Sequence, residues 1–116
     1  MPKNILSCLL TATLVLSTSL TAWAQPLSYP ERPIKIIVPF APGATLDLMT
    51  RAFGQALSTE LKQSVIVENK AGASGIIGAE ATARAEPDGY TFMMAPFSVL
   101  AVNPSLHQNL PYDPLK

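Results

Sequence analysis

This chain has no complete set of catalytic residues, judged by residue type and spacing. Gly72, Gly75 and Gly78 follow an apolar run, but Ser74 stands where the dinucleotide-binding fingerprint Gly-x-Gly-x-x-Gly requires a second glycine. The same segment also lacks the Gly-x-Ser-x-Gly spacing of a nucleophile elbow. We therefore interpret the three glycines as a turn and a close approach of a helix to its neighbours.

The other reactive residue types occur singly. His107, the only histidine, has no carboxylate or serine at a motif spacing, so an exposed loop position is favoured over a general base. Cys8, the only cysteine, lies in the N-terminal apolar run, and the rest of the chain therefore has no thiol for catalysis or metal binding. Asp47 falls in the first turn of a predicted helix, where a carboxylate complements the helix dipole. The sequence predicts no enzyme active site, no cofactor and no metal site.

Residues 33–61 indicate a binding function instead. An apolar run from Ile34 to Phe40 ends at Ala41-Pro42-Gly43, which is the pattern of a buried strand that stops at a tight turn. The residues that follow predict an amphipathic helix with a core-facing stripe at spacings of three and four: Leu46, Met49, Phe53, Leu57 and Leu61. The first N–H groups of this helix and the positive end of its dipole favour an anionic ligand beyond the end of the strand.

The remaining elements predict an α/β fold with the order βαβαβ. They are strands near residues 34–39, 64–68 and 90–95, helices near 46–62 and 76–85, and the start of a third short helix at 98–101. Right-handed crossovers between parallel strands place the first strand between the other two, which gives the sheet order 2-1-3. Ligands of such sheets bind beyond the carboxyl ends of the strands at the switch point, and this nominates residues 40–47 and 95–99.

Residues 1–24 have the pattern of a cleaved export signal. Lys3 precedes an apolar run from Ile5 to Leu20, and Ala22-Trp23-Ala24 supplies the small-x-small pattern that signal peptidase recognises. The run is shorter and more polar than the ~20 apolar residues that a membrane span needs. We expect cleavage after Ala24 and a periplasmic product of residues 25–116. The chain has 8 Lys or Arg and 8 Asp or Glu without a basic stripe, which argues against a nucleic-acid partner.

Six short motifs follow one another along residues 25–116. They are Tyr29-Pro30-x-x-Pro33, Val38-Pro39-Phe40-Ala41-Pro42-Gly43 with Asp47, Val67-Glu68-Asn69-Lys70-x-Gly72-Ala73-x-Gly75, Ile77-Gly78-Ala79-Glu80, Pro87-Asp88-Gly89-Tyr90-Thr91, and Asn103-Pro104-Ser105-Leu106 with Leu110-Pro111-Tyr112-Asp113-Pro114. Together they resemble the motifs of the Bug-type receptors, the periplasmic solute-binding proteins of tripartite tricarboxylate transporters.

This resemblance implies a two-lobed Venus-flytrap fold, of which residues 25–116 would form part of the N-terminal lobe. It also implies a small carboxylate-bearing solute, membrane subunits of the transporter as partners, and a monomeric receptor. The solute would be held by the loops after the first and third strands, at the positions that match the family's motifs: Phe40, Ala41, Gly43, Ala44, Thr45 and Ser98.

The chain departs from the family pattern at Ala44 and Leu46, where the family usually has a second glycine and a threonine. If residue 44 needed a positive φ, an alanine would cost about 1 kcal/mol or more. We also expect the chain to be an N-terminal fragment that binds weakly or not at all by itself. Two other functions remain open at this point, a ligand-sensing adaptor for a membrane sensor kinase and a disfavoured small secreted hydrolase.

Overall fold

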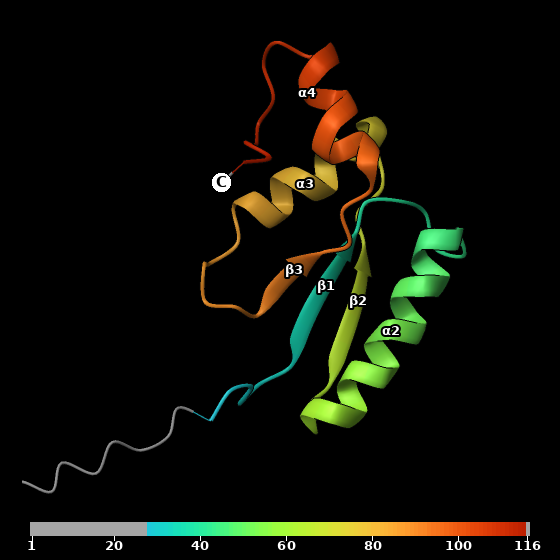
Figure 1. The fold of residues 1–116 in the computed structure, drawn as a ribbon, viewed down its shortest axis with the longest axis vertical. Coiled ribbons are helices and arrows are strands. Elements are labelled where there is room, and N and C mark those ends of the chain that lie inside the picture. Colours follow the sequence, from blue (N-terminus) through green and yellow to red (C-terminus); the bar gives the residue numbers. More distant parts are fainter. Residues whose placement is uncertain (1–27, 116) are drawn as a thin grey trace, which may run out of the picture.

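The computed structural model describes residues 28–115, so the predicted signal peptide and its cleavage site lie outside the described residues. Three parallel strands form one sheet in the order β2-β1-β3 (Figure 1): β1 (Ile34–Val38), β2 (Val65–Asn69) and β3 (Thr91–Met93). Ile36 of β1 lies opposite Val67 of β2 and Phe92 of β3. The predicted α/β class, parallel pairing and strand order are confirmed.

The central strand is the most apolar and the most buried. Ile34, Ile36, Ile37 and Val38 are each at most 4% exposed, as expected for a strand covered on both faces of a parallel sheet. Lys35 is exposed and pairs with Glu68 of β2, with Nζ and Oε2 2.9 Å apart. β3 is shorter than the predicted 90–95, although the Met94 N–H still donates to the Ile37 carbonyl at 3.0 Å.

Two helices cover opposite faces of the sheet. α2 (Thr45–Leu61) packs on the face that carries Val65 and Val67. The two elements are so close there that a Cβ added at Gly54 would lie 3.2 Å from Val65 Cγ1. α3 (Ile76–Ala83) packs on the other face, where Ala79 and Met93 line a common cavity. Successive side chains of a strand alternate between faces, which separates Met93 from the Val65 and Val67 layer.

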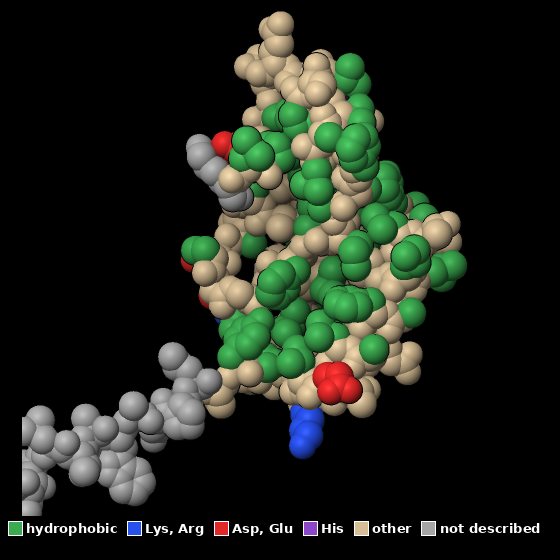
Figure 2. Space-filling model, viewed as in Figure 1, with side chains coloured by type: hydrophobic (Ala, Val, Ile, Leu, Met, Phe, Trp, Pro, Cys, Tyr) green, Lys and Arg blue, Asp and Glu red, His purple; other side chains and the backbone are tan. Residues whose placement is uncertain are grey.

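The predicted core-facing stripe of α2 is wrong for two of its members. Met49 is 62% exposed and Phe53 is 52% exposed, whereas Asp47, Thr50 and Gly54 are the buried residues of this helix. The reason is close packing: Gly54 allows the helix backbone to approach β2, so the small and polar side of the helix faces the sheet. Phe53 and Leu57 of α2 line a groove together with Phe92 and Met93 of β3, and the face of the molecule in Figure 2 is rich in hydrophobic side chains.

The chain after β3 is more helical than predicted. A π-helical turn, η2 (Ser98–Val102), continues directly into α4 (Asn103–Leu106), and Pro104 is tolerated because it lies at the start of that helix. The sequence predicted only the start of a short helix at 98–101, so the helical residues after 101 were not expected. Within residues 28–115, no helix is long and apolar enough to cross a membrane.

Candidate functional site

The loops after all three strands meet at the carboxyl end of the sheet (Figure 1). Pro39, which directly follows β1, lies at their meeting point. A Cβ added at Gly75 would come within 3.3 Å of Pro39 Cβ and 2.8 Å of Val99 Cγ2, and one added at Gly78 within 2.9 Å of Pro39 Cβ. Gly75 also has a φ of 89°, so the interpretation of these glycines as a turn and a close approach is confirmed.

Five of the six predicted ligand-binding residues lie together where β1 leads into α2: Phe40, Ala41, Gly43 and Ala44 are in the loop, and Thr45 is the first residue of the helix. Gly43 has a φ of 84°, which favours glycine, whereas Ala44 has a φ of −66° and a ψ of 157°. The conformation of residue 44 is therefore ordinary extended backbone, and the alanine at this position carries no strain.

The N-terminus of α2 has free hydrogen-bond donors. Ala44 is its N-cap residue and provides no side-chain cap, and its N–H is 3.3 Å from the Ala41 carbonyl oxygen. Among the described residues, the N–H groups of Thr45 and Leu46 have no acceptor. Unpaired donors in the first turn of a helix, together with its dipole, attract an anion such as a carboxylate.

Asp47 is buried beneath this loop and accepts hydrogen bonds on both carboxylate oxygens. Its Oδ2 accepts from the Gly43 N–H at 2.8 Å and from Arg51 Nε at 3.0 Å, and its Oδ1 accepts from Asn69 Nδ2 at 2.9 Å. The hydrogen bonds from Arg51, Gly43 and Asn69 lower the pKa of Asp47 to about 2. The carboxylate is thus ionised and fully engaged, which supports the structural role that its position in the helix predicted.

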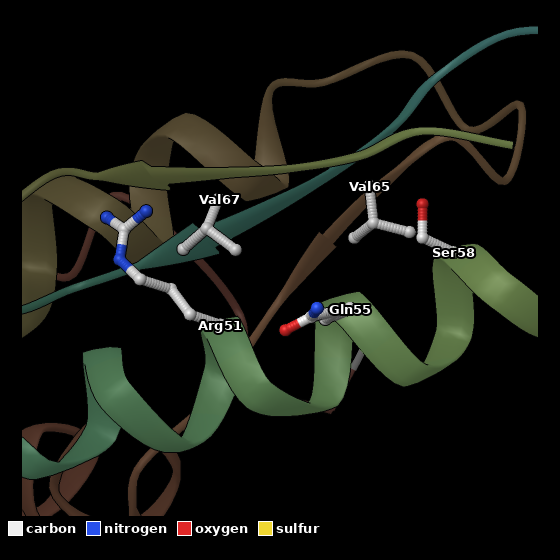
Figure 3. Close-up of a pocket in the computed structure, with 6 residues that line it drawn as sticks. Arg51, Gln55, Ser58, Val65 and Val67 are labelled. Atoms are coloured by element: carbon white, nitrogen blue, oxygen red, sulfur yellow. The ribbon is translucent and has the colours of Figure 1, made fainter.

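Asn69, the last residue of β2, connects this carboxylate to the loop backbone. Its Nδ2 also donates to the Phe40 carbonyl oxygen at 3.1 Å, and its Oδ1 accepts from Arg51 Nη2 at 2.9 Å. Figure 3 shows the Arg51 side chain extending from α2 towards β2. Sequence reasoning assigned no role to Arg51 or Asn69. The available signals were the place of Asn69 at the end of a β-branched run and its presence in the motif that begins Val67-Glu68-Asn69-Lys70.

Ser98, the sixth predicted residue, begins η2 at the same end of the sheet. Its Oγ is buried and has no hydrogen-bond partner among the described residues. The hydroxyl is shielded from solvent, whereas Ala41, Gly43 and Thr45 are exposed. The structure therefore brings the loop of Ser98 to the predicted edge without placing its hydroxyl on the same open surface.

Positive side chains near this edge already have carboxylate partners. Arg51 pairs with Asp47, and Lys70 Nζ lies 2.8 Å from Glu68 Oε1. Residues 28–115 contain no group of three or more His, Cys, Asp or Glu that could hold a metal ion. The chemistry that this edge offers is therefore hydrogen bonding from backbone amides.

A separate cavity of about 360 Å³ lies on the flank of α2, against β2 (Figure 3). It is lined by Arg51, Gly54, Gln55, Ser58, Val65 and Val67. None of the predicted ligand-binding residues contributes to it. The cavity belongs to the packing of helix on strand and is not the predicted site.

Comparison with known proteins identifies the family. Residues 49–116 match the family described as "Tripartite tricarboxylate transporter family receptor". The chain belongs to this family. It is 46% identical over 97 residues to BugT of Bordetella pertussis, and this match covers 80% of the chain and 30% of BugT.

Solved structures of this receptor family share the fold of the described residues. The periplasmic binding protein BugD superposes with a TM-score of 0.70 at 42% identity, covering 74% of this chain and 28% of BugD. MatC from Rhodopseudomonas palustris with bound malate gives a TM-score of 0.72 at 32% identity, covering 76% of this chain and 30% of MatC. These relatives are binding proteins rather than enzymes, and the present chain spans about a third of their length.

Proposed function

We propose that this chain forms one wall of a periplasmic site that captures a small carboxylate-bearing solute for a tripartite tricarboxylate transporter. The observation that carries the proposal is that the N–H groups of Thr45 and Leu46 at the N-terminus of α2, beside the Gly43 turn, have no acceptor within residues 28–115. In MatC, a relative with the same fold, the bound ligand is malate, a small carboxylate.

The proposed binding surface consists of Phe40, Ala41, Gly43, Ala44 and Thr45, with the loop of Ser98 beside it. Backbone amides and the helix dipole would bind the carboxylate, since the nearby Arg51 and Lys70 are already paired. Backbone donors fix the position of a carboxylate without a net charge on the protein. Because the site carries no net charge, the solute can dissociate when the receptor delivers it to the transporter.

A single wall binds weakly. A flytrap receptor gains affinity when two lobes close over the solute and exclude water, which strengthens every polar contact inside. An open loop contributes a few hydrogen bonds of about 1 kcal/mol net each, and these do not offset the several kcal/mol of freedom that a bound solute loses. We therefore expect millimolar affinity for this chain alone.

Titration of the isotope-labelled protein with malate and citrate, followed by nuclear magnetic resonance, tests this function. We expect progressive amide shifts at residues 40–47 and 97–99, saturating in the millimolar range, and no micromolar binding in calorimetry. Methyl esters of the same acids, which lack the anionic oxygens, serve as the control and should produce no such shifts. Shifts confined to other surfaces, or none at millimolar acid, would refute the proposal.

Export is the second part of the proposed function, because a receptor for a membrane transporter must reach the periplasm. We propose that residues 1–24 direct export, that cleavage after Ala24 leaves Gln25 as the new N-terminus, and that the product acts as a monomer with the transporter's membrane subunits. Mass spectrometry of a periplasmic extract should detect peptides that begin at Gln25. Recovery of the protein with residues 1–24 intact would contradict this.

A further inference from the structure

The loop between β1 and α2 has little apolar packing to hold its conformation. Ala41, Pro42, Gly43 and Thr45 are exposed, and a Cβ added at Gly43 would meet no atom within 4 Å. Its one internal backbone bond, from the Ala44 N–H to the Ala41 carbonyl, is long at 3.3 Å. Polar contacts from outside the loop must therefore select one conformation of this segment.

Those contacts come from the Asn69 amide and the Asp47 carboxylate. Asn69 uses both of its N–H donors, one on the Phe40 carbonyl oxygen and one on Asp47 Oδ1. Asp47 in turn accepts the Gly43 N–H at 2.8 Å. One amide from β2 thus fixes the loop directly at Phe40, near its start, and through Asp47 at Gly43, its left-handed turn.

The hydrogen-bonding capacities of these groups match completely. Asp47 is 2% exposed and ionised, and a buried carboxylate is costly unless donors surround it. Three donors do so: the Gly43 N–H, the Arg51 guanidinium and the Asn69 amide. The Asn69 oxygen accepts from Arg51, so its orientation in the network is also determined.

We infer that Asn69 is a positioning residue that holds the loop of residues 40–45 in its solute-receiving conformation before any solute arrives, with Asp47 as its intermediary. The inference rests on the proposed function, because it concerns the same loop. Holding the loop in advance reduces the ordering cost of binding, which raises affinity without a new contact to the solute. Asn69 itself need not touch the solute.

Hydrogen exchange at single amides tests the positioning role without any ligand. In the wild-type protein, the Gly43 amide should be protected while the unbonded amides of Thr45 and Leu46 exchange rapidly. The isosteric substitution Asn69→Asp removes both donors and places a second carboxylate against Asp47. It should accelerate Gly43 exchange roughly tenfold to a hundredfold more than exchange at the core amides of β1. Asn69→Ala provides the same comparison if the aspartate variant does not fold.

A swapped pair distinguishes positioning from general stability. In the double variant Asp47→Asn with Asn69→Asp, the amide introduced at position 47 can donate to the carboxylate introduced at position 69, while its own oxygen accepts the Gly43 N–H. We expect this variant to recover several-fold of the Gly43 protection lost in Asn69→Asp but not all of it, because the Phe40 carbonyl still lacks its amide donor. The control Glu68→Gln removes ion pairs on the opposite face of the same strand and should leave Gly43 exchange unchanged.

The outcomes separate the two proposals. Gly43 exchange that changes only in step with the β1 core amides in every variant overturns the positioning role. Malate titration of the same proteins gives the second readout: Asn69→Asp should weaken binding several-fold and Glu68→Gln should not. Absence of malate shifts in the wild-type protein counts against the proposed function alone, since the Gly43 measurements need no ligand.

Discussion

Gly78 of α3 lies directly against Pro39, the residue that follows β1. A Cβ added at Gly78 would meet Pro39 Cβ at 2.9 Å, Pro39 Cα at 3.0 Å and the Lys70 carbonyl oxygen at 3.1 Å. These atoms belong to the backbone or are fixed to it, so they cannot move aside as a flexible side chain would. The approach of α3 to the carboxyl end of the sheet therefore depends on the missing side chain.

The substitution Gly78→Ala should consequently destabilise the fold by about 1–3 kcal/mol, the usual cost of overpacking, in spite of the better helix propensity of alanine. Urea denaturation followed by circular dichroism measures it. Gly54→Ala is the matched control, because the nearest neighbour there is the side-chain atom Val65 Cγ1 at 3.2 Å. A lower denaturation midpoint for Gly54→Ala than for Gly78→Ala would contradict the packing argument.

The stability of the protein should fall in acid. Hydrogen bonds from Arg51, Gly43 and Asn69 lower the pKa of Asp47 from 3.8 to about 2, and those from Lys70 and Lys35 lower the pKa of Glu68 from 4.5 to about 2. Because both folded-state values lie below the ordinary ones, the stabilisation is present above pH 4.5 and is lost as the pH falls towards 2.

Urea midpoints measured between pH 2 and pH 7 check this pH dependence, with the main decrease expected between the ordinary and the lowered pKa values. Glu68→Gln should reduce the slope, since a group that does not titrate cannot contribute to it. A midpoint that is constant or rises as the pH falls through this window would show that neither carboxylate is stabilised by its partners.

The pattern of the sequence predicted those parts of the fold that depend on local order. The apolar run of β1, the breakers after it and the crossover rule were enough to predict the parallel order β2-β1-β3. The rotation of α2 was predicted incorrectly, because hydrophobic spacing does not reveal that Gly54 brings one side of the helix against Val65. Close packing at Gly54 fixes the rotation of α2, although this rotation leaves Met49 and Phe53 exposed to water.

The candidate site was predictable at the level of its loop but not of its supports. Proline and glycine spacing located the turn at Gly43, whose positive φ agrees with that prediction. The bonds from Asn69 to Phe40 and Asp47 depend on the register of β2 against β1, which pairs Asn69 with Val38. Register follows from tertiary packing, so one sequence alone offered no means of assigning Asn69 its partners.

Tyr90 should anchor the segment that leads into β1. Its ring lies 5.1 Å from the Tyr29 ring and 4.2 Å from the Arg32 guanidinium carbon, and its hydroxyl accepts the Glu31 N–H at 2.9 Å. Tyr90→Phe removes only the hydroxyl and should cost about 1 kcal/mol, whereas Tyr90→Ala also removes both ring contacts and should cost more. Equal thermal melting temperatures for the two variants would show that the ring contacts contribute nothing.

An apolar groove lies between α2 and β3 on the surface of the described residues. It encloses about 240 Å³ and is lined by Ile36, Phe53, Leu57, Phe92, Met93 and Met94. Phe53 is 52% exposed and Phe92 is 45% exposed, so large aromatic surfaces remain in contact with water. Contiguous apolar surface of this kind promotes association. At high concentration we expect the purified protein to bind an apolar fluorescent dye and to self-associate non-specifically, without a discrete dimer, whereas the receptor at its working concentration is proposed to be a monomer.

Phe53→Lys should weaken both the dye binding and the association, because it places a charge at the groove and removes an aromatic ring from it. Leu48→Lys is the matched control: Leu48 lies on the same helix, is 59% exposed, and does not line the groove. Sedimentation velocity over a range of concentrations, together with dye titration, gives the measurement. If Leu48→Lys suppressed association as strongly as Phe53→Lys, added charge alone would explain the effect. A wild-type protein that stays monomeric and binds no dye would show that the groove does not promote association.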